Sequence, residues 1–387
     1  MSINEVNLKR RTLIQYAATG AAVASVGGFS AWATTEPVIE ANSPAYAYWS
    51  HKEKNALSDM EFLVMCATLA PSPHNTQPWL FKIADNKIDI HADKNRHLKS
   101  ADPDYRMMIL AIGAAIENLR VAAHQLGYAP TISLNGDTAE FLSSGYCASI
   151  TLAPQNPAST PYFNAIFNRQ TTRTAFDLSK PVNPQFLQEL QAQAAEFPGI
   201  EIQWVKKRAG RDPIAQIVRE SARSYLTDTC HRDGMNWFRI TRQQWESNGD
   251  GISVFNGDAP AAIKRYVELM VSSDDLLQDA FKQGEIDSVD RLSAATPMWG
   301  VITTKNDSFQ QKLRAGQMVE RVYLEASLNG LAVQPQCYPT ETSEGVARLK
   351  SELNLADGTE PLFLFRIGHS NHIAKSVRRN IKDVILT

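Results

Sequence analysis

The sequence predicts an α+β protein in which two similar halves of one chain form a pseudo-dimer. Three observations predict this fold. A β-hairpin pattern occupies residues 79–90, an amphipathic helix pattern follows at residues 109–126, and that helix pattern recurs 203 residues later, from Gly113 to Gly316. The 387-residue chain is 43% hydrophobic and 21% charged, so it has the composition of a folded protein with room for two domains.

The hairpin and the first long helix are predicted from their periodicity. Apolar and polar residues alternate from residue 79 to residue 90 around a polar turn at Asp85 and Asn86, which is typical of a β-hairpin. Gly127 stands in the position of a C-terminal cap of the helix that follows. The apolar positions of that helix recur at steps of three and four residues: Ile109, Ile112, Ile116, Leu119, Ala123 and Leu126.

The repeat lies in this helix. The pattern G-x-x-I-E-x-L-x-x-x-A-x-x-x-G at residues 113–127 returns as G-x-x-V-E-x-V-x-x-x-A-x-x-x-G at residues 316–330, and a short strand pattern follows each copy, at 131–134 and 331–333. Two amphipathic helices can resemble each other by chance because packing dictates their apolar positions. The shared Gly, Glu and Ala residues nevertheless favour an internal duplication, and hence a pseudo-dimer.

Weaker patterns complete the expected organisation. Strands are expected at 201–205, 300–304 and 362–367, and helices at 62–70, 183–195, 212–225 and 264–270. Residues 219–254 are rich in Arg and aromatic residues without a clear period, so we interpret them as an insertion that forms a lid over a ligand. The first half is then residues 51–155, and the second half is residues 156–387.

The N-terminus resembles a twin-arginine export signal. Arg10 and Arg11 precede an apolar stretch at 17–26, and Ala31-Trp32-Ala33 offers a small-x-small cleavage site. We therefore expect a signal at residues 1–33 and a linker at 34–50, with the twin-arginine export machinery as a partner and a periplasmic location. A short uncleaved anchor or a chance basic start is the alternative. The apolar core is too short for a comfortable bilayer span, so no stable membrane span is expected after cleavage.

Charge and cysteine spacing exclude other classes. A formal net charge of −2 gives no global basic field for nucleic acid, so an anionic ligand must be bound by a local group of cations. The four cysteines form no CxxC pair, and no metal site is predicted. No GxGxxG follows a strand pattern, which argues against a Rossmann domain.

Three segments carry candidate binding residues. Residues 71–79, PSPHNTQPW, place groups that donate and accept hydrogen bonds between stiffening prolines, as the edge of a planar ligand such as a flavin requires. Arg169 and Arg173, with threonines between them, suit a phosphate. Arg378 and Arg379 belong to a basic run near the C-terminus. Taken singly, the three could equally be a structural turn, a solvated surface and a solvated tail.

Together the three segments resemble the FMN-dependent nitroreductase superfamily. The order of the segments differs from that of an ordinary family member, in which the arginine motif precedes the Pro-Ser loop and two chains share each site. Here the Pro-Ser loop comes first, as in a divergent single-chain branch, the Acg type, whose one chain imitates the dimer. The resemblance covers residues 52–387 and implies a nitroreductase-like fold for each half.

The resemblance also implies a cofactor and an activity. FMN would be bound once per chain, and the activity would be that of an exported FMN-dependent oxidoreductase that passes electrons from a small-molecule donor to a nitroaromatic or quinone acceptor. The alternative is a protein that stores or sequesters FMN without turnover. No protein residue is expected to be catalytic, since the flavin carries the redox chemistry. The expected FMN-binding residues are Pro71, Ser72, Pro73, Asn75, Gln77, Arg169, Thr171, Arg173, Arg378 and Arg379.

Overall fold

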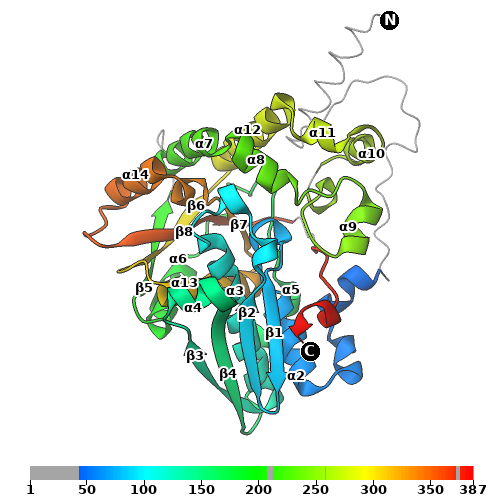
Figure 1. The fold of residues 1–387 in the computed structure, drawn as a ribbon. Coiled ribbons are helices and arrows are strands. Elements are labelled where there is room, and N and C mark those ends of the chain that lie inside the picture. The colour runs from blue at the N-terminus through cyan, green and yellow to red at the C-terminus, as the bar shows by residue number, and fades with distance from the viewer. Residues whose placement is uncertain (1–42, 207–211, 258, 372–374, 387) are drawn as a thin grey trace, which may run out of the picture.

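The computed structural model describes residues 43–206, 212–257, 259–371 and 375–386 (Figure 1). The expected export signal at 1–33 and most of the expected linker lie outside these residues, so both remain predictions. Within the described part, helices and strands form two separate sheets with helices packed on them. The α+β class predicted from the sequence is confirmed.

The first half is built around a five-stranded sheet of order β3-β4-β2-β1-β9. The predicted hairpin is confirmed, with β1 (Trp79–Ala84) antiparallel to β2 (Lys87–Ala92) and a turn at Asp85 and Asn86. Strand β3 (Tyr128–Leu134) pairs with β4 (Tyr146–Pro154) at the far edge. Two helices lie with this sheet, α2 (Asp59–Thr68) and α4 (Thr138–Ser144). A capping box between Ser58 and Glu61 begins α2, because each side chain satisfies a free backbone N–H of the first turn.

The second half is built around a four-stranded antiparallel sheet of order β5-β6-β8-β7. Its strands are β5 (Ile200–Lys206), β6 (Met298–Thr304), β7 (Ala332–Pro335) and β8 (Glu360–Gly368), so the strands expected at 201–205, 300–304 and 362–367 are confirmed. The expected helices are confirmed as α6 (Pro184–Gln193), α7 (Pro213–Tyr225) and α10 (Ala261–Met270). The remaining helices of this half are α8 (Asp228–Met235), α9 (Arg242–Asn248), α11 (Ser273–Leu276), α12 (Asp279–Ala294) and α14 (Ser343–Leu353).

The two long repeated helices, α3 (Arg106–Leu126) and α13 (Phe309–Leu328), pack against each other in the middle of the molecule (Figure 1). Their contact is reciprocal. A Cβ added to Gly113 would lie 2.1 Å from the Leu313 carbonyl oxygen, and one added to Gly316 would lie 2.2 Å from the Leu110 carbonyl oxygen. Equivalent residues thus meet equivalent residues, as in an isologous dimer interface. The predicted pseudo-dimer is therefore present within one chain, and two glycines allow the close approach of its central helices.

The halves also exchange segments. Helix α5 (Pro161–Asn168), which the sequence assigns to the second half, buries Phe163, Ile166 and Phe167 in the hydrophobic core of the first half. The C-terminal residues return to the same core, where the two-residue strand β9 (Ile385–Leu386) runs parallel to β1. Each sheet is therefore completed by chain that lies far from it in sequence, and the segment that leads to the arginine motif begins in the opposite half.

Helices α7, α8 and α12 lie together on one side of the central helix pair, with α9 beside them (Figure 1). The expected insertion begins later than the sequence suggests, because Arg219 to Tyr225 form the last turns of α7, whose apolar face packs with β6 and β8 in one cluster. We define the lid segment as residues 226–257. Among the described residues, one helix, α3, is long and apolar enough to span a membrane, and 83% of its most apolar window is buried inside the protein.

Candidate functional site

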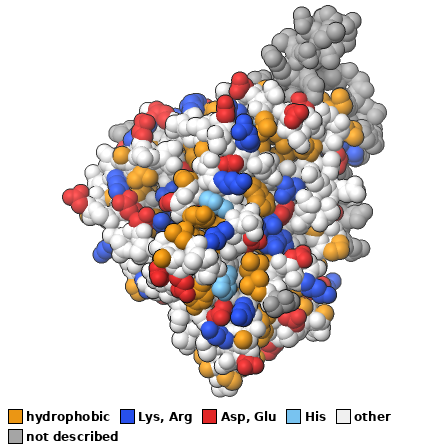
Figure 2. All heavy atoms as spheres, viewed as in Figure 1, with side chains coloured by type: hydrophobic (Ala, Val, Ile, Leu, Met, Phe, Trp, Pro, Cys, Tyr) orange, Lys and Arg blue, Asp and Glu red, His pale blue; other side chains and the backbone are white. Residues whose placement is uncertain are grey.

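A cavity of about 400 Å³ lies between the two halves, with the lid segment on one side of it. Its walls combine the Pro-Ser loop, the C-terminal end of the arginine motif, the central helices and the lid segment. In the same orientation as the ribbon, hydrophobic side chains gather with Lys, Arg and His side chains over the middle of this face of the molecule (Figure 2). Five expected residues contribute to the cavity wall: Pro71, Ser72, Pro73, Thr171 and Arg173.

The Pro-Ser loop is held in an unusual backbone conformation. His74, Asn75 and Gln77 have φ values of 47°, 53° and 50°, in the left-handed region that non-glycine residues rarely adopt. Such a conformation persists only when the surroundings fix it, and strained backbone of this kind is common at binding sites. The Ser72 hydroxyl accepts a hydrogen bond from the backbone N–H of Gln77 at 2.9 Å, and this bond closes the loop on itself.

Asn75 and Gln77 fix the surroundings of this loop and do not line the cavity. The Asn75 side-chain amide donates to the carbonyl oxygens of Gly251 and Val377, at 3.3 and 3.1 Å. The side-chain NH₂ of Gln77 donates to the Gly249 carbonyl oxygen at 2.7 Å, and the side-chain oxygen of Gln77 accepts from the Arg379 backbone N–H at 3.0 Å. These two expected ligands thus tie the lid segment and the C-terminal tail to the loop, so their effect on a ligand is indirect.

The arginine motif runs beside strand β7. The Thr172 amide donates to the Val333 carbonyl oxygen at 3.0 Å, so the motif extends the second sheet by one bridge. Successive side chains of an extended segment point to opposite sides, and Thr171 and Arg173 both face the cavity. Arg173 donates to the Asn256 side-chain oxygen at 2.7 Å. Burial lowers the pKa of Arg173, which costs free energy that an anionic ligand would offset.

Arg169 belongs to a separate group of cations around one tryptophan. The guanidinium carbons of Arg169 and Arg378 lie 5.6 and 4.6 Å from the centre of the Trp49 ring, and Lys375 Nζ lies 4.5 Å from it. The Arg169 guanidinium also lies 4.9 Å from the ring centre of Tyr323, which lines the cavity. We call Arg169, Lys375 and Arg378 the cation cluster. It adjoins the cavity behind Tyr323 and Thr171, whose hydroxyl oxygens are 2.9 Å apart.

The cation cluster carries donors without partners. Within the described residues, Arg169 Nε and Nη1 and Arg378 Nε are buried and make no hydrogen bond. Buried guanidinium donors without acceptors cost free energy, so a group with several acceptor oxygens is expected to occupy this place. Burial, with Arg169 and Arg378 nearby, lowers the pKa of Lys375 to about 8. The remaining Arg378 nitrogens are already used, since they donate to Asn75, Val377, Leu69 and Ala70.

One carboxylate, Glu320, faces this cluster. It is fully buried on α13, and burial raises its pKa to about 8 although Arg169, Asn118 and Arg378 oppose that shift. The raised pKa means that the guanidinium groups do not hold Glu320 as a strong ion pair. The cluster therefore keeps a net positive charge that a ligand can neutralise. Trp49, Glu320, Tyr323 and Lys375 were not assigned from the sequence, although Lys375 lies in the basic run noted near Arg378.

Arg379 has a different position from that expected. Its guanidinium donates to the carbonyl oxygens of Gln77 and Asp383, at 3.1 and 2.8 Å, and it does not line the cavity. Arg378 and Arg379 are therefore not an equivalent pair. Arg378 joins the cation cluster, and Arg379 holds the C-terminal turn η10 (Ile381–Asp383) against the Pro-Ser loop.

The lid segment lines the cavity through Met235, Phe238, Ile252 and Val254, beside Tyr225 at the end of α7. It is fastened to the first half by Asp250, which forms ion pairs with both Arg96 and Arg239. Of the aromatic residues expected to cover a ligand, only Phe238 and Tyr225 line the cavity. Trp237 lies against Arg96 and Arg239, and Trp245 is buried against Tyr46 and donates to the Gly251 carbonyl oxygen at 3.1 Å.

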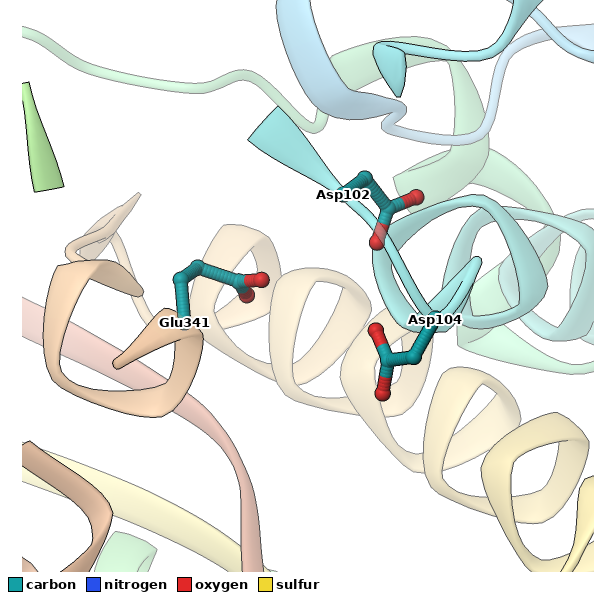
Figure 3. Close-up of side chains that lie close together, drawn as sticks. All are labelled: Asp102, Asp104 and Glu341. Carbon is teal, nitrogen blue, oxygen red and sulfur yellow. The ribbon is translucent and has the colours of Figure 1, made fainter. Parts of the chain in front are cut away.

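An acidic group lies near the cavity at the start of α3. Asp102, Asp104 and Glu341 come close enough to share an ion, with Glu341 on η9 (Tyr338–Glu341) facing the other two (Figure 3). Each carboxylate already has partners. Asp102 accepts from the amides of Met107 and Met108, which caps α3, and Glu341 and Asp104 form ion pairs with Arg106 and Lys312. Helix capping and ion pairing therefore account for this group.

Sequence comparison relates the chain to mycobacterial proteins. It is 25% identical over 325 residues to the protein named "Putative NAD(P)H nitroreductase Rv3131" of Mycobacterium tuberculosis, which covers 82% of this chain and 88% of that protein. It is 30% identical over 116 residues to "Putative NAD(P)H nitroreductase acg" of the same organism, which covers 29% of this chain and 34% of that protein. No protein-family model matches the sequence.

Among solved structures, the FMN-dependent nitroreductase NfnB of Mycobacterium smegmatis aligns with 58% of this chain and 96% of its own, at 15% identity and a TM-score of 0.40. The long sequence match covers both halves of this chain, including the Pro-Ser loop and the arginine motif, whose residues meet at one cavity. Over most of its length the chain is therefore similar to mycobacterial proteins named as nitroreductases, and the nitroreductase superfamily is the family that this similarity supports.

Proposed function

We propose that the protein is an exported, FMN-dependent oxidoreductase that passes electrons from reduced flavin to a small electrophile of the nitroaromatic or quinone class. The observation that carries this proposal is the cation cluster of Arg169, Lys375 and Arg378, whose unpartnered donors adjoin a cavity walled by the Pro-Ser loop. Such a site suits a ligand with an anionic group at one end and a flat, partly apolar ring system at the other. Flavin mononucleotide is a ligand of this kind. The names of the mycobacterial relatives agree with this class of activity.

The residues present fit FMN. Arg169 Nε and Nη1, Arg378 Nε and the Lys375 ammonium would bind the phosphate, since bidentate guanidinium groups match phosphate oxygens. Thr171 and Arg173 would border the ribityl side and the ring edge, and Pro71 to Pro73 would lie against the ring. When bound, FMN would supply the two-electron redox chemistry. The buried Arg173 guanidinium would stabilise negative charge that develops beside it.

The test is flavin binding by the purified protein. We expect one FMN per chain, because only one Pro-Ser loop and one arginine motif are present and they meet at one cavity. Absorption spectroscopy after reconstitution with FMN measures the stoichiometry, and anaerobic reduction with NADH, NADPH and dithionite identifies the donor. A protein that binds no FMN, or binds two per chain, would contradict the proposal.

The second candidate function, storage of FMN without turnover, is favoured by the fastened lid segment. Asp250 joins the lid segment to Arg96 of the first half, and Phe238 and Val254 cover the cavity from that side. If storage is the function, Asp250→Asn should speed reduction of bound FMN by NADPH or dithionite. Glu201→Gln serves as a matched control. Glu201 also forms an ion pair, with Lys305, but it is exposed and lies on the outer strand β5. Rapid NADPH oxidation by the unaltered protein with a nitroaromatic acceptor would contradict storage.

Export is the part of the proposal that rests on sequence alone. The twin-arginine pathway reads a pair of guanidinium groups, so replacing Arg10 and Arg11 together by lysine should leave the protein in the cytoplasm. Fractionation of cells that express the two forms measures this directly. Normal export and cleavage of the double variant would show that residues 1–33 are not such a signal.

A further inference from the structure

A linked group of titratable side chains lies in the wall of the cavity and has no part in holding FMN. The Tyr338 hydroxyl donates to Glu285 Oε1 at 3.0 Å, and His231 Nδ1 lies 3.6 Å from Glu285 Oε2. The other ring nitrogen of His231, Nε2, lies 2.7 Å from the Leu276 carbonyl oxygen, which fixes the ring. Tyr338, Glu285 and His231 come from η9, α12 and α8, and all three line the cavity. We call them the proton group.

The proton group adjoins the flavin loop. His74, at the tip of the Pro-Ser loop, is within electrostatic reach of Glu285, His231 and Arg173, although burial has the largest effect on its pKa and lowers it. His74 Nε2 would lie 3.1 Å from a Cβ at Gly234 of α8, so the loop and the helix that carries His231 touch. A ligand that stacks on a flavin held by this loop would therefore reach the proton group.

The surroundings are mostly apolar. Leu226, Met235, Phe281, Val289 and Phe363 line the cavity around the proton group. The other titratable groups that line the cavity, besides His74 and Arg173, are Tyr225, Cys230, Arg291, Tyr323, Cys337 and Glu341, and Glu341 is paired with Arg106. Tyr225 donates to the Ala101 carbonyl oxygen at 2.6 Å, and Cys230 Sγ donates to the Ser100 carbonyl oxygen at 3.2 Å. Apolar walls with one polar end suit a flat aromatic molecule that carries an oxygen at its edge.

A quinone requires a particular partner at that edge. Its oxygen accepts a hydrogen bond before reduction and, as a hydroxyl, donates one afterwards. A tyrosine hydroxyl beside a carboxylate can do both at one atom, since it donates its proton to the quinone oxygen and, once Glu285 has returned a proton to it, accepts a hydrogen bond from the product while it donates to Glu285. The two adjacent oxygens of a nitro group would leave one of them without a donor here. The group therefore matches a quinone better than a nitroaromatic compound.

We propose that Tyr338 donates a proton to the oxygen of a quinone acceptor bound in this cavity, and that Glu285 and His231 replace that proton. The proposal rests on the proposed function and names its acceptor class. Tyr338 would touch the acceptor and act as a catalytic acid. Glu285 and His231 act through Tyr338 and are positioning and relay residues.

The protons and electrons balance. Bound FMN, once reduced, would supply an electron pair and one proton together as a hydride, and the quinone would then be a hydroquinone monoanion that needs one further proton. The Tyr338 O–H bond breaks, and its proton forms the second O–H bond of the hydroquinone. Tyr338 regains a proton from Glu285, and Glu285 takes one from protonated His231 Nδ1. Solvent protons then recharge this pair through the part-exposed Glu285 side chain, since His231 is buried. The sum is one quinone, two electrons and two protons converted to one hydroquinone.

The acid–base properties of the group agree with these roles. Burial lowers the pKa of His231, but its contacts with Glu285 and the Leu276 carbonyl outweigh burial and raise it overall, so it carries a proton more readily near neutral pH. Burial and Glu285 raise the pKa of Tyr338 well above its usual value, so it keeps its proton until an acceptor oxygen gains negative charge.

The experiment compares Tyr338→Phe and Glu285→Gln with Ser288→Ala, a control that lines the same cavity one helical turn from Glu285. Pre-reduced, FMN-loaded protein is mixed with menadione in stopped flow, and separately with ferricyanide, which takes electrons without protons. We expect Tyr338→Phe to slow menadione reduction ~10²–10⁴-fold, the usual contribution of a general acid, and to leave ferricyanide reduction unchanged. Ser288→Ala should change neither rate by more than a few-fold.

Two readouts do not depend on turnover. Calorimetric titration of oxidised protein with menadione should show weaker binding by Tyr338→Phe, about 2–10-fold for one lost hydrogen bond. NMR titration of His231 should show a lower pKa in Glu285→Gln. Equal menadione rates in Tyr338→Phe and the unaltered protein, with flavin bound and ferricyanide reduced, would overturn the proton-donor role alone. Failure of the unaltered protein to bind FMN or to reduce either acceptor would overturn the proposed function itself.

Discussion

The two repeated glutamates of the central helix pair, Glu117 and Glu320, have matching sequence and opposite electrostatic surroundings. Glu117 of α3 accepts four guanidinium hydrogen bonds, two from Arg120 and two from Arg321, and we call this network the Glu117 site. The matching Glu320 of α13 accepts no guanidinium hydrogen bond from the described residues, and we call its surroundings the Glu320 site. The partners explain the difference, because Tyr323 stands where the repeat would place a second Arg120, and Asn118 stands where it would place a second Arg321.

The comparison shows how one site arises from a duplicated frame. At the Glu117 site, burial raises the pKa of Glu117, but Arg120 and Arg321 outweigh burial and lower that pKa overall, so the charges are balanced within the protein. At the Glu320 site, the cations are supplied by the distant segments of Arg169, Lys375 and Arg378, and part of their hydrogen-bonding capacity stays unused. The Glu117 site is thus a structural ion-pair network, and the Glu320 site is prepared for an anion.

The largest effect is expected at the Glu117 site. Arg321→Ala leaves Glu117 fully buried with Arg120 as its remaining partner in this network, and it also removes the bonds from Arg321 to Gln193 and Glu196. Breaking a buried ion pair costs ~3–5 kcal/mol, so the free energy of unfolding should fall by about that amount. Urea unfolding followed by circular dichroism measures it. FMN affinity of the folded fraction should stay unchanged, and a change in affinity as large as that in stability would contradict the different roles of the two sites.

The next largest effect is expected on FMN affinity and not on stability. Arg169→Ala removes two of the unpartnered donors of the cation cluster, so FMN affinity should fall by ~1.5–3 kcal/mol, the value of charge-assisted hydrogen bonds. Fluorescence titration of flavin-free protein measures it. Arg120→Ala, at the Glu117 site, is the matched control and should leave FMN affinity within a factor of two to three. Equal losses for both variants would mean that the phosphate does not bind at the cation cluster.

Gly113 and Gly316 test the symmetry of the frame itself. An added Cβ at either position would overlap a carbonyl oxygen of the opposite helix, so Gly113→Ala and Gly316→Ala should each lower the free energy of unfolding by ~1–3 kcal/mol, despite the better helix propensity of Ala. Because the two contacts are equivalent, the two losses should agree within about 1 kcal/mol. Thermal unfolding compares them. A loss in only one variant would show that the helices do not pack reciprocally.

Much of this frame could be predicted from sequence because it depends on local patterns. The hairpin at residues 79–90, the capped helix ending at Gly127 and the repeat at Gly316 follow from periodicity and from glycines. The residue types and spacing of the Pro-Ser loop, Thr171 and Arg173 predict one shared ligand. These residues line one cavity, and their binding of FMN stays a prediction. These features need no knowledge of which distant segments meet.

The rest depends on long-range contacts that no local pattern records. Strand β4 was missed because its residues are buried in near-continuous fashion and do not alternate. Trp49 lies in a segment interpreted as a linker, and it becomes part of the site only because Arg169 and Arg378 fold onto it. Asn75 and Gln77 have the residue types of flavin ligands, yet tertiary contacts with the lid segment and the C-terminal tail use their hydrogen bonds.

The smallest effect concerns pH and separates the two glutamates most sharply. Glu320 and Lys375 both have a pKa of about 8, the first raised by burial and the second lowered by burial. As pH rises through 8, Glu320 gains negative charge and Lys375 loses positive charge, and both changes oppose binding of a phosphate dianion. FMN affinity should therefore fall ~3–10-fold between about pH 7 and about pH 8.5.

The free energy of unfolding of the FMN-free protein should also fall as pH rises, because of Glu320. A carboxyl whose pKa is raised above its usual 4.5 stabilises the folded state below that value, and the contribution is lost as pH rises through the folded pKa of about 8. Glu320→Gln should remove this loss of stability at high pH and should make FMN affinity depend less on pH. Lys375→Arg should remove the part of the pH dependence of FMN affinity that is due to Lys375, because arginine stays charged. Glu117→Gln is the contrasting variant, since the pKa of Glu117 is lowered and its titration lies in the acid range. If Glu320→Gln leaves both profiles as steep as before, the carboxylate does not titrate beside the phosphate, and the cation cluster is balanced in the same way as the Glu117 site.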